Sequence, residues 1–289
     1  MYRQYWKLLR PHQWTKNLVC FAGVIFGGQL HSLIAIRSAF AVCLMFIAAS
    51  SAMYIFNDIQ DVERDRQHPR KRFRPIASGQ ISIGVACAMA TFLILVSLWV
   101  GYSLNVATVI CLSIYIILNL AYSVKLKHIV IVDVTCIALG FVLRLMAGVY
   151  AIDDTPTGWI TLCTFFLSLF LGFCKRRSEL YEFENNFQKQ RPVLQFYTIS
   201  YLDALVNNTG IMAIISYALF TTTTDKNPSL VITIPLVNYG IMKYHHLLVA
   251  CKLTESPDRV LLKNLEIQLA LVLWLILYIA LTYADLNIL

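Results

Sequence analysis

The sequence has few charged residues, and this shortage argues against an ordinary soluble domain. Only 14% of its 289 residues are charged, whereas about a quarter is usual in soluble domains. Long apolar runs recur up to the C-terminus instead, and 58% of all residues are hydrophobic. Because about 20 apolar residues can cross a bilayer as a helix, the composition predicts a polytopic membrane protein.

Several sequence signals of other protein classes are missing as well. The eight cysteines are scattered and form no C-x-x-C pair, so neither a zinc site nor a disulfide framework is expected. No Walker loop, G-x-S-x-G or H-E-x-x-H motif occurs. The first apolar run lacks a small-residue cleavage site, so no cleavable signal peptide is expected. The net charge of +8 does not indicate nucleic acid, because the basic residues lie at the ends of apolar segments.

Nine apolar segments of spanning length follow an amphipathic N-terminus. Residues 1–17 mix aromatic, aliphatic and basic side chains, as an interfacial helix does. The expected spans are 18–35, 38–57, 84–103, 105–122, 129–151, 157–174, 203–222, 229–247 and 265–284. No linker or soluble domain separates them, so the expected fold is one all-α transmembrane domain over residues 1–289.

The positive charge is distributed unevenly between the two sides of this topology. With the N-terminus inside, the inner loops hold 21 of the 24 Lys and Arg residues. Those loops are 1–17, 58–83, 123–128, 175–202 and 243–264. This asymmetry follows the positive-inside rule and places the functional surface on the cytoplasmic side.

A stripe of acidic residues follows the second expected span. Asn57, Asp61 and Asp65 recur at helical spacing, and Asp58 joins their face. Three carboxylates on one stripe repel one another unless water or a divalent cation screens them, and oxygen ligands favour Mg²⁺. We therefore interpret Asp58, Asp61 and Asp65 as catalytic metal ligands, with Asn57 in support. The alternative is a charged surface loop that is satisfied by its own salt bridges.

A basic run continues directly from the acidic stripe. Its members are Arg64, Arg66, Arg70, Lys71, Arg72 and Arg74. Acidic metal ligands beside a basic clamp suit a phosphorylated substrate, because guanidinium groups bind phosphate through paired hydrogen bonds. The run is therefore a candidate substrate-binding segment. Two prolines and Gly79 shape the loop, so it is expected to be an ordered cap and not a flexible linker.

A second polar group lies at the same membrane surface. Tyr122, Lys125 and Lys127 are candidate substrate-binding residues. Asp133 follows among apolar residues, where an acid needs a cation, a metal or water, so it is a further catalytic candidate. The alternative for Asp133 is a salt bridge to one of the two lysines. Arg144 lies deeper in the same span and is expected to pair with an acid or line a polar cavity.

The remaining polar clusters are interpreted with more weight on structural roles. Lys16 and Asn17, at the mouth of the first span, are substrate-binding candidates, and snorkelling is the alternative for Lys16. The basic run Lys175-Arg176-Arg177 is interpreted as a topological signal. The adjacent His245 and His246 have no third ligand at metal-binding spacing.

Several motifs carry a resemblance to a known family. Asn57-Asp58-x-x-Asp61-x-x-x-Asp65 and Arg10-Pro11-x-x-Trp14-x-Lys16-Asn17 resemble the UbiA superfamily of membrane prenyltransferases. Longer strings are similar to its branch of decaprenyl-phosphate phosphoribosyltransferases. These are Asp65-Arg66-x-His68-Pro69-x-Lys71-Arg72-Phe73-Arg74-Pro75-Ile76-Ala77-x-Gly79, Tyr122-Ser123-x-x-Leu126-Lys127, Gly140-Phe141-Val142-Leu143-Arg144 and Lys175-Arg176-Arg177-x-Glu179-Leu180. One departure is informative: prenyltransferases of the superfamily typically carry a second D-x-x-x-D motif, and here Ile137 stands where the second Asp would follow Asp133.

The resemblance implies a reaction, a fold and partners. It implies a helical bundle around a cavity open to the cytoplasm, in a bacterial plasma membrane. The implied reaction is Mg²⁺-dependent transfer of a 5-phosphoribosyl group from phosphoribosyl diphosphate to a polyprenyl phosphate, with release of diphosphate. Assembly into homo-oligomers is left open. Two alternatives remain: transfer of a polyprenyl group from its diphosphate to an aromatic acceptor, and a transporter or lipid-binding protein.

Overall fold

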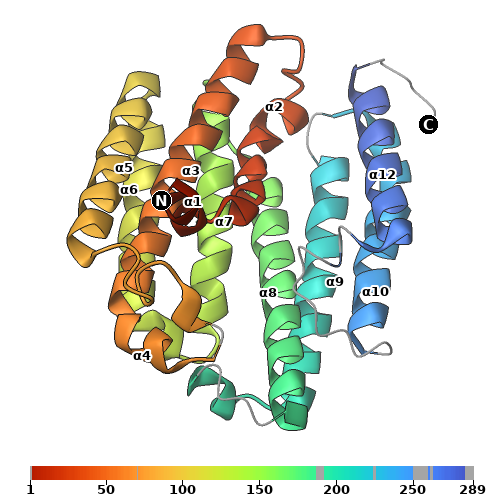
Figure 1. The fold of residues 1–289 in the computed structure, drawn as a ribbon. Helices are drawn as coiled ribbons and strands as arrows, with labels where there is room; N and C mark the ends of the chain where they lie inside the picture. The colour runs from red at the N-terminus through yellow and green to blue at the C-terminus, as the bar shows by residue number, and fades with distance from the viewer. Residues whose placement is uncertain are drawn as a thin grey trace. The chain divides into compact units, whose positions relative to one another are not determined.

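The computed structural model describes residues 2–69, 71–186, 192–223, 226–249, 260 and 263–283. Arg70 lies outside the described residues. Within the described ranges every regular element is a helix (Figure 1). The chain forms two compact units: unit 1 is Met1–Leu126 with Gly140–Pro156, and unit 2 is Lys127–Leu139 with Thr157–Leu289. Helix α7 (Val132–Tyr150) contributes its beginning to unit 2 and its larger part to unit 1.

Unit 1 is built from long helices with clear start signals. Ser32 caps α3 by accepting a hydrogen bond from the Ala35 amide, and Asn105 caps α6 through the Thr108 amide. Such caps satisfy amide groups that have no partner within the helix. The elements are α1 (Tyr2–Leu9), η1 (Pro11–Phe21), α2 (Ala22–Phe26), α3 (Leu33–Gln60), α4 (Val62–Gln67), η2 (Lys71–Phe73), α5 (Ile83–Leu104) and α6 (Val106–Val124).

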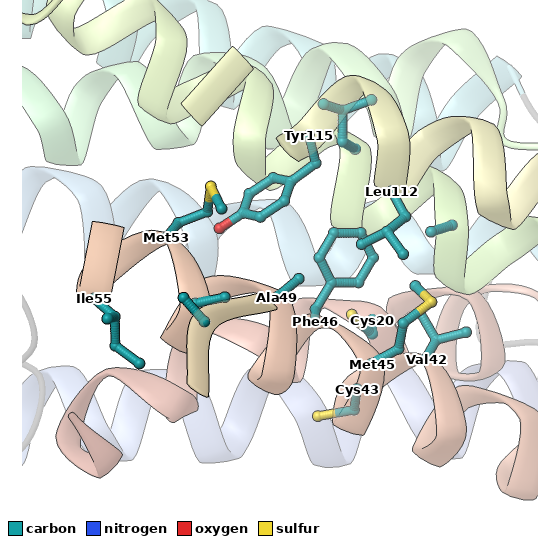
Figure 2. Packing of buried hydrophobic residues seen from close by; sticks show 14 of the residues in the cluster. Cys20, Val42, Cys43, Met45, Phe46, Ala49, Met53, Ile55, Leu112 and Tyr115 are labelled. Atoms are coloured by element: carbon teal, nitrogen blue, oxygen red, sulfur yellow. The ribbon is translucent and has the colours of Figure 1, made fainter. Parts of the chain in front are cut away.

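The core of unit 1 combines small and large side chains along α3. Phe46 packs edge-on against Tyr115, with ring centroids 5.2 Å apart, and Leu112 lies beside them (Figure 2). Ala49 and its small neighbours let α5 and α6 approach α3 closely. These residues belong to one buried cluster, so α3 is the central helix of the unit.

The segment that leads into the first expected span is a 3-10 helix, η1, whose backbone lies against α7. A Cβ atom added to Gly148 would lie 2.1 Å from the Cys20 carbonyl oxygen, so only glycine fits there. Runs of 3-10 helix longer than three or four residues are uncommon. Here the close backbone contact and the burial of Asn17 and Cys20 stabilise an 11-residue run.

Unit 2 is organised around the packing of α8 on α9. Phe170 and Phe173 are buried between the helices, and Gly172 leaves room for the Val134 side chain from α7. The elements are η3 (Leu126–His128, which begins at the last residue of unit 1), α8 (Gly158–Asn186), η4 (Pro192–Phe196), α9 (Ile199–Thr223), η5 (Pro228–Thr233), α10 (Ile234–Val249) and α12 (Leu265–Tyr283).

Seven helices in the described part of the chain are long and apolar enough to cross a membrane. They are α3, α5, α6, α7, α8, α9 and α12, and each coincides with an expected span. The other two expected spans do not coincide with one long helix. Residues 18–35 run from the end of η1 through the short α2 to the start of α3, and 229–247 falls in η5 and the 16-residue α10. The all-α polytopic membrane fold is thus confirmed, whereas the number of nine spans stays a prediction.

Candidate active site

Two members of the acidic stripe of unit 1, Asp58 and Asp65, are buried and share one guanidinium group. Nη1 of Arg74 lies 2.8 Å from Oδ1 of Asp58 and 2.7 Å from Oδ2 of Asp65. Nη2 of Arg10 donates to the same Oδ1 of Asp58. The two aspartates are almost fully buried, so they need these cations, because an unpaired charge away from water is costly.

The spacing of the acidic stripe predicts one continuous helix, but the structure divides the stripe between two helices. Helix α3 ends at Gln60, and Asp61 sits between α3 and α4 with non-helical dihedrals. Its amide still bonds to the Asn57 carbonyl at 3.0 Å, and its carboxylate accepts from the Asn57 amide group at 3.1 Å. The break separates the roles of the acids: Asp58 and Asp65 meet at one arginine, while Asp61 is held by Asn57.

The loop that carries Arg74 packs against the core of unit 1. Ile76 and Ile81 are buried in the core of unit 1, and the Ile81 amide bonds to the Pro75 carbonyl at 3.0 Å. Gly79 takes a left-handed backbone with φ of 75°, which a side chain would disfavour. The buried segment next to Arg74 therefore fixes the position of the Arg74 backbone.

Arg10 reaches Asp58 from a strained turn between α1 and η1. Its φ of 53° lies in the left-handed region, which is unusual for a residue other than glycine. The preceding Leu9 carbonyl accepts hydrogen bonds from the Trp14 indole at 3.2 Å and the Ser51 hydroxyl at 3.1 Å. Strained residues persist where the surroundings over-determine them, often at functional sites.

Several of the other polar candidates of unit 1 are exposed. Arg66 pairs with Glu63 at 2.7 Å on the surface, and the Arg72 guanidinium lies 4.9 Å from the Phe73 ring centroid. Lys125 is exposed, whereas Lys16, Lys71 and Tyr122 are half-buried. Arg66, Arg72 and Lys125 thus provide cationic groups at the surface, whereas Lys16 and Lys71 are half-buried like Arg10 and Arg74.

Asn17 has a different environment from the one predicted at the mouth of a span. It is fully buried, and its side-chain oxygen accepts from Nε of Arg144 at 2.7 Å. Arg144 also donates to the Tyr115 hydroxyl and the Gly140 carbonyl, each at 2.8 Å, and lies over the rings of Phe46, Tyr115 and Phe141. Arg144 was expected to pair with an acid or line a polar cavity; the partners that it has among the described residues are neutral acceptors and aromatic rings.

In unit 2, Asp133 is sealed in an ion pair. Its Oδ2 accepts from Nε of Arg176 at 2.6 Å, and its Oδ1 accepts from the Tyr197 hydroxyl at 3.0 Å. Asp133 and Arg176 are essentially inaccessible, and Glu179 binds another nitrogen of Arg176 at 2.9 Å. Asp133 therefore has the cation that its apolar position required, and that cation is Arg176. Lys127, also in unit 2, is half-buried in the short η3 turn.

A strained residue also precedes this second site. Ile131 has φ of 68°, an outlier for a β-branched side chain. Its amide donates to the Tyr197 hydroxyl at 2.6 Å, which in turn donates to Asp133. Burial raises the pKa of the Tyr197 phenol well above its usual range, so the hydroxyl keeps the proton that it donates.

The interpretation of Lys175-Arg176-Arg177 as a purely topological signal is wrong. Arg177 is buried like Arg176, donates to Asp203, and bonds to the Leu248 carbonyl at 3.1 Å. Both arginines lie within α8, which continues without a break to Asn186, and their side chains are buried inside unit 2. Burial with specific acids indicates a structural role that charge counting cannot reveal.

The donor set of unit 1 suits a hard cation, although no complete metal site is formed. Among the described residues, no group of three or more His, Cys, Asp and Glu side chains is arranged to hold a metal ion. Asp58 and Asp65 nevertheless direct one oxygen each to a single cationic nitrogen. Carboxylate oxygens are the ligands that Mg²⁺ prefers, so the two acids fit such an ion at the place that Arg74 now neutralises.

Three residues of these two clusters were absent from the predicted set. Arg10 and Arg176 both lie in motifs that resemble the UbiA superfamily, so the strings held the signal without the role. Tyr197 lies in no motif, because its contact with Asp133 is made by a turn far along the chain.

The comparisons with known proteins agree with these motifs. The model of the UbiA prenyltransferase family matches residues 17–265. A decaprenyl-phosphate phosphoribosyltransferase of Corynebacterium glutamicum is 33% identical, over 96% of this chain and 86% of its own length. The enzyme of the same name from Mycolicibacterium smegmatis is 30% identical, over 93% and 89% respectively.

Solved structures agree on the fold. A UbiA homologue of Archaeoglobus fulgidus, solved with GPP and Mg²⁺, superposes with a TM-score of 0.73 at 21% identity, covering 96% of this chain and 98% of its own. At that identity the likeness concerns the fold alone. Together with the family match and the curated relatives, it identifies the chain as a membrane-embedded transferase that belongs to the UbiA prenyltransferase family.

Proposed function

We propose that the chain transfers a 5-phosphoribosyl group from phosphoribosyl diphosphate to a polyprenyl phosphate of the decaprenyl type and releases diphosphate. Relatives at about 30% identity over most of the chain carry the name of this activity. The single observation that favours it over prenyl transfer lies in unit 2. Both oxygens of Asp133 are engaged by Arg176 and Tyr197, and Ile137 takes the place of a second acid. Unit 2 therefore has a built-in cation in place of a second acidic metal motif.

The acids of unit 1 are proposed to hold Mg²⁺. Asp58, Asp61 and Asp65 would supply the ligands, with Asn57 orienting Asp61. A bound Mg²⁺ would supply positive charge to the diphosphate leaving group. The use of Mg²⁺ in an archaeal structural neighbour supports this choice of ion.

The bond changes need no strong base. The bond between the anomeric carbon and the diphosphate oxygen breaks, and the diphosphate leaves with the electron pair. A phosphate oxygen of the lipid forms the new bond to the same carbon. Because this nucleophile is already anionic, the protein's contribution is positioning and charge stabilisation.

Cationic side chains divide naturally between the two substrates. The donor phosphates are assigned to four basic residues. Arg66 lies on α4, and the other three lie in the cap loop between α4 and α5: Lys71, Arg72 and Arg74. The acceptor phosphate is assigned to Lys125 and Lys127, which flank the α6–α7 turn, and Tyr122 precedes them on α6. Lys16, at the start of the chain, adds a further cation. The concentration of Lys and Arg in the inner loops supports a cytoplasmic active site in the plasma membrane.

The test is a donor–acceptor assay with purified protein in detergent or lipid. We expect diphosphate release that requires Mg²⁺ and needs phosphoribosyl diphosphate and polyprenyl phosphate together. Glu63→Gln, which removes an exposed acid next to the stripe, serves as the control and should release diphosphate at the normal rate.

The alternative is prenyl transfer to an aromatic acceptor. It is supported by the family as a whole and by the GPP-bound archaeal neighbour. Activity with an allylic diphosphate and an aromatic acid, with no product from the phosphoribosyl pair, would replace the first proposal by this one.

A further inference from the structure

Two proposed metal ligands of unit 1 are already paired with arginines. Asp58 and Asp65 are the proposed ligands, yet Arg74 bonds to both and Arg10 bonds to Asp58. A metal ion and these guanidinium groups require the same oxygens. Binding of the ion to the two acids is therefore an exchange of cations, and not an addition to open ligands.

Arg74 is the arginine best suited to leave. Its side chain is 27% exposed, and a single nitrogen, Nη1, makes both of its bonds to the acids. Its backbone is held by the buried Ile76 and by the hydrogen bond from the Ser78 amide to the Arg74 carbonyl at 2.9 Å. The guanidinium can therefore move while the loop stays in place. Arg10, by contrast, is held between Asp58 and the ring of Tyr54, whose centroid lies 5.0 Å from its Cζ.

The departing guanidinium needs a new anionic partner. A diphosphate donor that arrives with the metal offers phosphate oxygens, which arginine binds as well as carboxylates. Metal alone offers none, so Arg74 would have to leave two buried acids for water. The metal ion and the donor should therefore bind with strong positive coupling, and the coupling is reciprocal by thermodynamic linkage.

We propose that Arg74 is an exchangeable counter-ion that couples metal binding to donor binding. It neutralises Asp58 and Asp65 in the resting enzyme and moves to a donor phosphate when the metal takes the two acids. The binding of a metal ion by Asp58 and Asp65 and the identity of the donor rest on the proposed function. The exchange itself requires that metal ion and a donor that carries a diphosphate.

The test measures metal and donor separately in the full-length protein, without acceptor lipid. Mn²⁺ is the metal probe, because it takes oxygen ligands as Mg²⁺ does and its free form is quantified by electron paramagnetic resonance. Donor binding is measured as retention of labelled phosphoribosyl diphosphate at a metal concentration that saturates every variant. Arg74→Gln removes the counter-ion and keeps a polar side chain.

The expected result has two opposite signs. Arg74→Gln should bind Mn²⁺ alone about tenfold more tightly than the wild type, and it should retain the donor at least about tenfold less. Arg74→Lys keeps one charge without the planar fork, so its Mn²⁺ affinity should lie between the two. If Arg74→Gln does not fold, the lysine variant alone decides the matter through tighter Mn²⁺ binding than the wild type.

A matched control removes the same charge at a distant position, on α3. Arg37 is exposed near the other end of the helix, about 30 Å from Asp58 by helix rise. Arg37→Gln should leave Mn²⁺ affinity and donor retention unchanged. Equal effects of Arg37→Gln and Arg74→Gln on Mn²⁺ would reduce the result to net charge and overturn the proposal.

The remaining outcomes also decide. An arginine that only binds phosphate would lower donor retention and leave Mn²⁺ affinity as it is, and that pattern contradicts the exchange. Weaker Mn²⁺ binding in Arg74→Gln contradicts it as well. Tighter Mn²⁺ binding combined with retention of geranyl diphosphate, but not of phosphoribosyl diphosphate, would support the exchange and refute the proposed donor.

Discussion

The acids of the two units are neutralised in contrasting ways. In unit 1, Asp58 is buried, but its partners Arg10 and Arg74 are 20% and 27% exposed. In unit 2, both members of the pair Asp133–Arg176 are sealed, with Arg176 only 1% exposed. A left-handed backbone accompanies each pair: in unit 1 it belongs to Arg10 itself, and in unit 2 to Ile131, two residues before Asp133.

The difference separates a site that can change partners from one that cannot. Water reaches the arginines of unit 1, so their release from the acids is partly compensated by solvation. Opening the pair in unit 2 would leave two unsolvated charges, which costs several kcal/mol per ion. We infer that the acids of unit 1 take part in ligand exchange, while Asp133 positions Arg176 within a fixed framework.

The largest expected effect is loss of catalysis when an acid of unit 1 is neutralised. Asp58→Asn removes a proposed metal ligand and should lower the rate of diphosphate release on the order of a thousandfold. Because Arg10 and Arg74 are partly exposed, the protein should remain folded, as judged by size-exclusion chromatography. A rate within a factor of a few of the wild type would contradict the metal assignment.

The next effect is on the stability of unit 2. Asp133→Asn leaves Arg176 buried without its main charge partner and should lower the free energy of unfolding by about 3–5 kcal/mol. The measurement is thermal or denaturant unfolding in detergent. Combining Asp133→Leu with Arg176→Met should recover part of the loss, because neither member of the buried pair then remains without the other; the contact between Arg176 and Glu179 is lost as well. A double variant as unstable as Asp133→Asn would show that packing, and not charge, dominates.

A smaller effect is expected from Tyr197→Phe, which deletes one hydroxyl that both accepts and donates. The loss of the bond to buried Asp133 should cost about 1–3 kcal/mol of stability at neutral pH. Folding raises the pKa of this phenol, so its contribution is complete below the unfolded value near 10 and is lost as pH rises above it. The difference between wild type and variant should therefore shrink in alkaline unfolding experiments. A constant difference up to pH 11 would contradict the assignment.

The smallest effect is expected at the exposed pair Arg66–Glu63. Both side chains are at least half exposed, so screening by water leaves at most about 1 kcal/mol, and typically less. Unfolding of Glu63→Gln should thus match that of the wild type at low and high salt. A loss comparable to that of Asp133→Asn would remove the distinction between surface and sealed pairs.

The sequence predicts the fold well because apolar length is a local property. In the described part of the chain, the seven helices that are long and apolar enough to cross a membrane coincide with expected spans. The position of the acidic stripe at the end of α3 also follows from spacing. The break at Asp61 does not, because it accompanies a tertiary contact, the ion pair between Asp65 of α4 and Arg74 of the following loop.

The partners of the charged residues were harder to predict, since they lie far apart in the chain. Asp133 was expected to need a cation, a metal or water, with Lys125 or Lys127 as the alternative partner. Its partner is Arg176, which lies 43 residues further along the chain on α8. Arg144 shows the same limit, because its contact with Asn17 spans 127 residues. Residue type identifies the need for a partner, whereas only tertiary packing supplies it.

The 3-10 helix η1 makes the N-terminal segment a spacer of fixed length. With three residues per turn, Trp14, Asn17 and Cys20 lie in one row along η1. Trp14 donates to the Leu9 carbonyl, Asn17 accepts from Arg144, and the Cys20 backbone lies against Gly148 of α7. One inserted residue would rotate everything beyond it by about 120° and detach Asn17 from Arg144 while Arg10 stayed at Asp58. Substitutions on the exposed side of this segment should therefore be accepted, whereas insertions and deletions should not.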